Sequence, residues 1–455
     1  MQKMRIFVIL VLLLLFLSAC IGGSDNYYED DSVDRGGSNQ LWGGLPFPIP
    51  QDGGGAAQQE RPDNNHVAGM GVDWVAPFTP PEAMELDIDR GAVIAVAINR
   101  SFAIGVDGTL YSWGNGFSGR LGDGATSDRH YPAAIMEGVS AVAASNYLAY
   151  AITNDRALYG WGGGQFNQGI GDGPDSLGRL IPTFVFDDVV SVTASGTSAS
   201  FITTEGNMYA FGQAMWSLMR FSFVNPREWP NWQERVPVMY LHGIQRISFN
   251  ENVGAMVINH AGELHGWDRH LESSGFVREY FVGWNFGARN ITSVSAEILP
   301  TMQNIADVSV GEDHVMILTQ DGRVYTWGRN NRGQLGNGTN ADSPSELVFV
   351  MDNVIHISAG HSHNLAITAN GTLYAWGNNQ FGRLGTGNVV NANTPVAVLQ
   401  NVNTAVAGVN HSMAVTNDGR LWAWGDNRQG QLGDGTTTSH HSPVVIMENM
   451  MTVQR

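Results

Sequence analysis

Three histidines stand at one distance before a tryptophan, and imidazole is a common metal ligand. His314, His363 and His411 each lie 13 residues ahead of a Trp. The other copies of the pattern place Arg100, Leu148, Ser198 and Gly254 at this position. Residues at one repeat position can approach a common axis, so a histidine metal site is one interpretation. We instead expect each ring to hydrogen-bond its own turn, with no metal and no cofactor bound.

Other chemical signatures are weak in this sequence. Asp-Gly pairs at 123–124, 172–173 and 434–435 and Asn337-Gly338 lack the D-x-D-x-D-G spacing of a calcium loop, which indicates turn residues. The sequence holds no G-x-S-x-G elbow, P-loop or C-x-x-C motif. We therefore expect no catalytic residues and a protein that is not an enzyme.

A tryptophan or phenylalanine marks each copy of the pattern. Each stands five residues after a turn residue, and neighbouring copies lie 48 to 60 residues apart. The aromatic residues are Trp113, Trp161, Phe211, Trp267, Trp327, Trp376 and Trp424, and the turn residues are Gly108, Arg156, Gly206, Gly262, Gly322, Gly371 and Gly419. A period of this length is typical of propellers and solenoids.

The elements that position these residues are short strands. In the sixth copy the strand candidates are Val354–Ala359, Asn364–Thr368, Thr372–Trp376 and Pro395–Leu399. Seven copies of four strands predict an all-β, seven-bladed β-propeller of about 50-residue, four-stranded repeats over residues 82–455. An open solenoid is the alternative, but residues 94–97 and 450–453 resemble partial repeats, which predicts that the chain ends meet in one blade.

Four segments resemble a known repeat. Residues 113–125, 327–339, 376–388 and 424–436 follow the pattern WGxxxxGxLGxG, with Gln or Arg before the Leu, and the sequences ahead of the last three agree as well. They look like the repeat of the regulator of chromosome condensation family. The resemblance covers about residues 90–450, is weak between about 190 and 305, and implies a propeller scaffold. We expect the repeat aromatic residues and Leu121, Leu335, Leu384 and Leu432 to fill the seams between blades.

The start of the chain predicts export. Residues 1–19 have a basic beginning and a 12-residue apolar run, which is the composition of a signal peptide. Leu17-Ser18-Ala19-Cys20 resembles a bacterial lipobox, whose Cys20 would be lipidated; an ordinary secretory signal with a chance cysteine is the alternative. Residues 20–81 are acidic and rich in Gly and Pro, which predicts a disordered tether. We expect a bacterial lipoprotein outside the cytoplasm, bound to the membrane through its lipid alone.

The charge balance bears on partners. Lys plus Arg number 24 against 42 Asp plus Glu, which gives a net charge of −18. An acidic chain repels phosphates, so we expect no nucleic-acid partner. A closed propeller has no free sheet edge to pair, and we expect a monomer.

Two insertions predict a binding surface. The intervals from Phe211 to Trp267 and from Trp267 to Trp327 exceed the usual spacing and are rich in aromatic residues and Arg, the types that dominate binding hot spots. The candidate partner-binding residues are Trp216, Phe221, Phe223, Trp229, Trp232, Arg278, Tyr280, Trp284 and Arg289. Repeat decay, with these residues filling a worn blade, is the alternative.

The leading functional hypothesis is a non-catalytic scaffold or inhibitor-like module that binds an extracytoplasmic protein. A second hypothesis is a propeller that binds carbohydrate or cell-wall glycan, with Trp216, Trp229, Trp232 and Trp284 as stacking platforms. A lyase or other enzyme built on a propeller is the third.

Overall fold

The structure is a computed structural model that describes residues 92–163, 170–173, 178–212, 237–250, 254–268 and 304–453. All of them belong to one compact unit, Arg61–Arg455. The predicted signal peptide, Cys20, the tether and all nine candidate partner-binding residues lie outside the described residues. Among the described residues, no helix is both long enough and apolar enough to cross a membrane.

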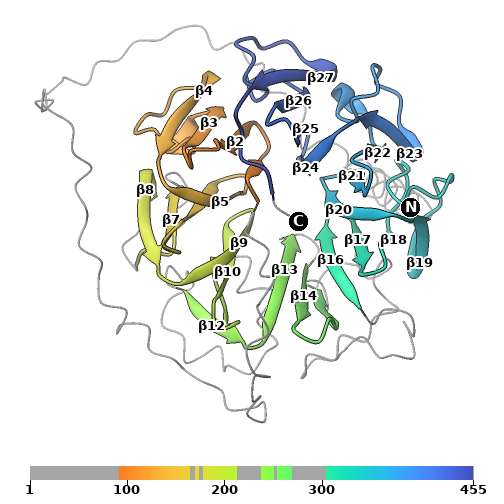
Figure 1. Ribbon diagram of the computed structural model, residues 1–455, viewed down its shortest axis with the longest axis horizontal. Coiled ribbons are helices and arrows are strands. Elements are labelled where there is room, and N and C mark those ends of the chain that lie inside the picture. Colours follow the sequence, from red (N-terminus) through yellow and green to blue (C-terminus); the bar gives the residue numbers. More distant parts are fainter. Residues whose placement is uncertain are drawn as a thin grey trace, which may run out of the picture. The chain divides into compact units, whose positions relative to one another are not determined.

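The described strands form seven antiparallel sheets, which we call blades one to seven in chain order (Figure 1). Blade one contains β1 (Ile94–Val96), β2 (Arg100–Ile104), β3 (Leu110–Gly114) and β4 (Arg129–Met136). Blade two contains β5 (Val139–Ala144), β6 (Leu148–Thr153), β7 (Leu158–Gly162) and β8 (Arg179–Phe186). Blade three contains β9 (Val189–Ser195), β10 (Ser198–Thr203), β11 (Met208–Gly212) and β12 (Val238–Leu241). Blade four contains β13 (Ile244–Asn250), β14 (Gly254–Asn259) and β15 (Leu264–Asp268).

The last three blades are complete. Blade five contains β16 (Ile305–Val310), β17 (His314–Thr319), β18 (Val324–Gly328) and β19 (Ser343–Met351). Blade six contains β20 (Val354–Ala359), β21 (His363–Thr368), β22 (Leu373–Gly377) and β23 (Ala392–Leu399). Blade seven contains β24 (Val402–Ala407), β25 (His411–Thr416), β26 (Leu421–Gly425) and β27 (His440–Met447). Short 3-10 turns, η2 (Phe117–Gly119) and η3 (Gln380–Gly382), follow β3 and β22. Four strands per repeat are thus confirmed for six blades, and blade four has three described strands.

The hairpin between the second and third strand of each blade explains the five-residue offset to the aromatic residue. The turn needs a residue with positive φ, which glycine adopts without strain. Arg156 takes this conformation in blade two, with φ of 68°, where the other six repeats have glycine. The aromatic residue then falls in the third strand, paired with the second strand, as Trp376 is with Asn364.

The innermost strand of each blade contacts that of the next blade, and the last contacts the first, which closes the ring (Figure 1). These strands are β1, β5, β9, β13, β16, β20 and β24. Closure also involves the C-terminal segment, because Met450 pairs with Gly105 and Met451 N donates to the Ile104 carbonyl at 2.9 Å. The prediction that the chain ends meet in one blade is confirmed: blade one receives residues from both ends.

The repeat aromatic residues fill the seams between blades. Trp113, Trp161, Phe211, Trp327, Trp376 and Trp424 are at most 1% exposed, as are the four seam leucines Leu121, Leu335, Leu384 and Leu432. Trp424 packs in one cluster with Leu365, Leu373 and Leu384 of blade six. Their burial agrees with the predicted structural role. Trp267, in β15, pairs with Ala255 of β14.

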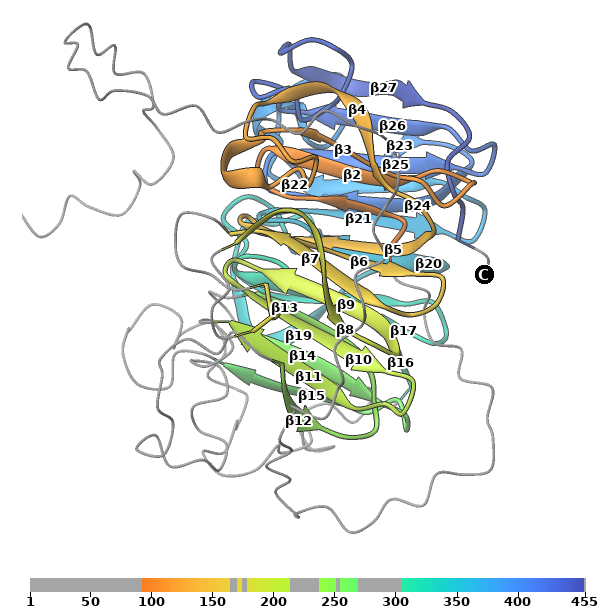
Figure 2. The same cartoon turned by 90° about the vertical axis from the view of Figure 1, so that its left-hand side faces the viewer.

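The strands run between two faces of the propeller (Figure 2). The loop face carries the turns between first and second strands and the WG loops that follow the third strands. The hairpin face carries the turns between second and third strands and the connections between blades.

Candidate partner-binding face

The three repeat histidines lie at the loop-face start of β17, β21 and β25, and each reaches the next blade. His314 Nε2 lies 2.7 Å from Asn364 Oδ1, and His363 Nε2 lies 2.9 Å from Ser412 Oγ. His411 Nε2 lies 2.8 Å from Ser101 Oγ, across the seam that closes the ring. The prediction that each ring hydrogen-bonds its own turn is therefore wrong. The rings of His314 and His363 lie against the glycine of their own turn, and all three rings use Nε2 for the neighbouring blade.

The hydrogen-bond directions fix the histidine tautomer. The Ser412 hydroxyl donates to the Arg383 carbonyl at 2.9 Å, so its oxygen accepts from His363 Nε2–H. The Asn364 amide donates to the Gln334 carbonyl at 2.6 Å, so its oxygen likewise accepts from the preceding histidine. The same carbonyls accept the indole N–H of the next Trp, as Arg383 O does from Trp424 at 2.9 Å. These relays join neighbouring blades.

His314, His363 and His411 are buried away from solvent, so they are poorly placed to bind a ligand or transfer a proton. All three are 0% exposed, and burial lowers the pKa of His363 well below its usual range and that of His411 to about 4. Their Nδ1 atoms have no hydrogen-bond partner. Among the described ranges, no group of three or more His, Cys, Asp or Glu side chains could hold a metal. A buried neutral imidazole committed to a neighbouring blade stabilises the scaffold.

The Asp-Gly positions are turn residues in the structure. Asp123 Oδ1 accepts from Ala125 N at 3.0 Å and Asp434 Oδ1 accepts from Thr436 N at 2.9 Å. Asp172 forms an ion pair with Arg179 at 2.5 Å. Their carboxylates are therefore engaged with the loop itself.

Arginines stacked on aromatic rings distinguish the loop face. Phe381 lies between two of them, with Arg428 Cζ 4.5 Å and Arg383 Cζ 6.0 Å from its ring centroid. Arg428 also forms a bidentate ion pair with the buried Asp426, at 3.0 and 3.1 Å. Phe381 has φ of 64°, a conformation that costs energy for a bulky residue. Strained backbone of this kind is found preferentially at functional sites.

A second cluster of the same chemistry lies where blades one and two meet. Arg120 Cζ is 5.3 Å from the Phe117 ring centroid and 5.1 Å from that of Tyr147. Phe117 is 43% exposed. Arginine and aromatic side chains are the types most enriched in binding hot spots, so both clusters offer contact residues on one face.

The hairpin face has a different character. Its turns and connections carry the carboxylates Asp107, Glu137, Asp155, Asp187, Asp188, Glu205, Glu263, Asp321, Asp352, Asp418 and Glu448, against the arginines Arg156, Arg323 and Arg420. Arg156, Arg323 and Arg420 lie within 3.4 to 3.8 Å of carboxylates on this face. The hairpin face is therefore rich in negative charge.

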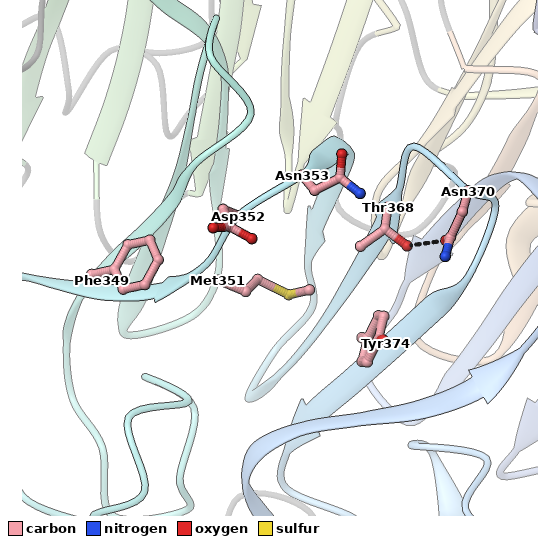
Figure 3. A pocket seen from close by; sticks show the side chains of 7 residues that line it. All are labelled: Phe349, Met351, Asp352, Asn353, Thr368, Asn370 and Tyr374. Atoms are coloured by element: carbon pink, nitrogen blue, oxygen red, sulfur yellow. Dashed lines mark hydrogen bonds between the residues drawn. The ribbon is translucent and has the colours of Figure 1, made fainter.

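An open hollow of about 320 Å³ lies on this acidic face between blades five and six (Figure 3). Its lining residues are Phe349, Met351, Asp352, Asn353, Thr368, Asn370 and Tyr374. Thr368 Oγ1 donates to Asn370 Oδ1 at 2.7 Å, so two polar groups of the hollow's lining already bond to each other (Figure 3). With one carboxylate and no cation in its lining, the hollow resembles a gap between turns more than a built ligand site.

The nine predicted partner-binding residues fall at 213–236 and 269–303, outside the described residues, so their role stays a prediction. The chain enters both segments from the loop-face ends of third strands, at Gly212 of β11 and Asp268 of β15. Gly212 and Asp268 thus lie on the face that carries the arginine–aromatic clusters, whereas Ile305, which begins the strand after the second segment, lies on the hairpin face.

Sequence reasoning missed these clusters. The available signal was the residue before each seam leucine, which is Arg120 and Arg383 in two repeats but Gln334 and Gln431 in two others. Because this position alternates between Arg and Gln in an otherwise regular motif, the propeller scaffold does not require one residue type there.

The comparisons with known proteins agree with this architecture. Models of the regulator of chromosome condensation (RCC1) repeat match residues 107–152, 321–367, 370–415 and 418–454, and a second model of the repeat matches 305–334, 354–383 and 403–431. These are repeats one, five, six and seven, where the sequence resemblance was expected to be strong.

Curated relatives share part of their length with this chain. The ultraviolet-B receptor UVR8 of Arabidopsis thaliana is 29% identical over 281 residues, 58% of this chain and 59% of the receptor. The E3 ubiquitin-protein ligase HERC2 of Homo sapiens is 27% identical over 292 residues, 61% of this chain but 6% of the ligase. The chain therefore spans less than two thirds of either relative.

The fold is shared with solved structures. Prp20p from Saccharomyces cerevisiae superposes with a TM-score of 0.57 at 18% identity, covering 75% of this chain and 86% of that one. The chain therefore contains repeats that match the regulator of chromosome condensation (RCC1) models, and it shares the propeller fold of Prp20p.

Proposed function

We propose that this protein is a non-catalytic, seven-bladed propeller that binds another protein through its loop face. RCC1-repeat propellers are typically protein-binding scaffolds. The observation that carries the proposal is the gathering of stacked arginines and aromatic rings on one face, and the strands that precede both insertions end on that face.

The compartment is part of the proposal. The apolar run at residues 6–17 and the Leu-Ser-Ala-Cys sequence that follows it support lipidation of Cys20 and an extracytoplasmic site of action. The partner would then be an extracytoplasmic protein, and residues 20–81 would join the propeller to the membrane. Radiolabelled palmitate incorporated by the wild-type chain and lost in Cys20→Ser would support this; equal labelling of both would contradict it.

The test of binding uses the complete chain, purified in detergent and fixed to beads, with surface and secreted proteins of the source cells as prey. We expect a partner that is retained by wild type and by the hairpin-face control Arg420→Ala. Phe381→Gly, which removes the stacked ring and relieves its positive φ, should lose the partner. A further variant changes Trp216, Trp229, Trp232 and Trp284 to Ala and reports on the insertions.

Circular dichroism confirms folding of each variant. A partner held equally by all of them would place the site away from the loop face. Retention on insoluble cell-wall glycan, without any captured protein, would replace protein binding by the carbohydrate hypothesis.

A further inference from the structure

Arg120 differs from the other stacked arginines because its guanidinium has no hydrogen-bond or ion-pair partner among the described residues. Its Nε is buried without an acceptor. The Phe117 and Tyr147 rings flank it at 5.3 and 5.1 Å, and burial lowers the Arg120 pKa. The side chain is therefore a partly desolvated cation with a buried Nε–H that no described residue accepts.

Arg383, at the same repeat position in blade six, has the hydrogen-bond partners that Arg120 lacks. Arg383 Nη1 donates to the Val409 carbonyl of the next blade at 2.7 Å, and its Nε donates to the Gln380 carbonyl at 3.0 Å. The counterpart of Val409 in blade two is Asn146, whose carbonyl accepts from Arg100 Nη1 at 3.1 Å. Arg100 stands where three other blades have histidine, so this replacement occupies the acceptor that Arg120 would use.

The two arginines also repel each other. Burial and, after it, the charge of Arg120 hold the pKa of Arg100 well below its usual range. Arg100 is only 2% exposed and is held by the carbonyls of Ser145 and Leu148 at 2.6 and 2.9 Å. No carboxylate contributes to the pKa shift of either group. The chain has a net charge of −18, yet these two neighbouring arginines have no carboxylate beside them among the described residues, which sets this position apart.

We propose that Arg120 binds a carboxylate side chain from an acidic segment of the partner polypeptide, with Phe117 and Tyr147 as the walls of the site. This inference rests on the proposed function and names its contact chemistry. A guanidinium can donate two parallel hydrogen bonds to a carboxylate. Aromatic rings stacked on its faces hold the guanidinium plane in one orientation. The bound carboxylate would offset the charge repulsion between Arg100 and Arg120. A polypeptide is favoured over a free anion because it would also cover the exposed Phe117 ring.

The test measures fluorescence anisotropy of a labelled synthetic peptide that alternates Glu with Leu, mixed with the complete chain. The matched probe replaces each Glu by Gln. The variant is Arg120→Gln, which the fold should tolerate because Gln334 and Gln431 fill the same position in blades five and seven. The control is Arg156→Gln, on the hairpin face, where the arginine side chain is 59% exposed.

We expect wild type and Arg156→Gln to bind the Glu peptide equally and the Gln peptide more weakly. Arg120→Gln should bind the Glu peptide about 10- to 100-fold more weakly, the loss expected when a charged hydrogen-bonding pair is removed. Unchanged binding by Arg120→Gln would overturn the proposal. So would displacement of the peptide by an equal concentration of inorganic phosphate, or a homodimer that Arg120→Gln dissociates.

Capture of the cellular partner separates this inference from the proposed function. If wild type and Arg120→Gln retain the partner equally, the protein-binding function stands and the assignment of Arg120 fails. If no variant retains a protein, the proposed function fails whatever the peptide shows. Loss of the partner in Arg120→Gln alone supports both.

Discussion

At the scale of single residues, the repeat histidine is a connector between blades. Its position at a strand start suggested a local role, yet its Nε2 reaches Asn364, Ser412 or Ser101 in the following blade. Each acceptor passes a hydrogen bond on to a backbone carbonyl. A buried polar chain of this kind is stabilising only while every member keeps its protonation state.

Acid should therefore weaken the propeller through His363 and His411, whose pKa values are lowered by burial. The folded pKa of His411 is about 4, because burial outweighs the nearby Asp426, and Arg383 adds to the lowering. In the unfolded chain the imidazole has a pKa of about 6.5, so the unfolded state binds the proton first as pH falls. The stabilisation is fully present above about pH 6.5 and is lost progressively down to about pH 4, by about 3 kcal/mol for this group.

Urea unfolding of wild type and His411→Gln between pH 7 and pH 4 measures this. The variant should lose less of its unfolding free energy over that range than wild type. His242→Gln, at an exposed position, is the control and should follow wild type. Parallel pH profiles for wild type and His411→Gln would show that the relay does not titrate on unfolding.

At the scale of elements, glycine serves two different purposes in each repeat. Gly419, in the β25–β26 turn, has φ of 75° and would meet no atom closer than 3.5 Å if it carried a Cβ. Gly433, in the WG loop of blade seven, has φ of 83° and would place a Cβ 2.6 Å from Trp113 Nε1. The first needs only a left-handed backbone, whereas the second also keeps the seam clear for the next Trp.

Alanine substitutions should separate these roles. Gly419→Ala should lower the free energy of unfolding by about 1 kcal/mol, the cost of left-handed backbone for an ordinary residue. Gly433→Ala adds overpacking against a buried ring and should cost about 2 to 4 kcal/mol. Chemical denaturation at neutral pH compares the two, and equal losses would mean that the seam relaxes around the added methyl group.

At the scale of the whole molecule, closure depends on residues from both ends of the described chain. Met450 is 3% exposed and packs with Ile94, Ala103 and Trp113 of blade one and with Met413 of blade seven. It stands where Val139, Val354 and Val402 begin the innermost strands of other blades. One side chain thus contributes to two blades at the point where the ring closes.

Met450→Ala should destabilise the propeller by about 2 to 5 kcal/mol, because it leaves a cavity in a shared core. Met450→Val restores the residue type used at the equivalent position and should lose much less. Thermal unfolding followed by circular dichroism gives the comparison. If Met450→Ala melts with wild type, the contact between the ends contributes little to stability.

The sequence by itself determined the repeat and its strands, because turn chemistry and the alternation of buried residues are local. The sixth copy shows this: the predicted Val354–Ala359 matches β20, β21 begins one residue earlier than predicted, and β22 is shifted by one residue. The fourth strand begins at Ala392 rather than Pro395, because its pairing at the loop-face end depends on the WG loop. The seam role of the tryptophans followed from their size and regular spacing.

Only the tertiary structure decided which atoms meet across the seams. The partner of His363 lies 49 residues away and Ser101 lies 310 residues from His411, distances at which the sequence holds no local signal. The same reason explains why Arg120 and Arg383, identical in motif, differ in environment. Whether a guanidinium is satisfied depends on which carbonyl of the neighbouring blade is already occupied, and that is a property of two packed repeats rather than of either one.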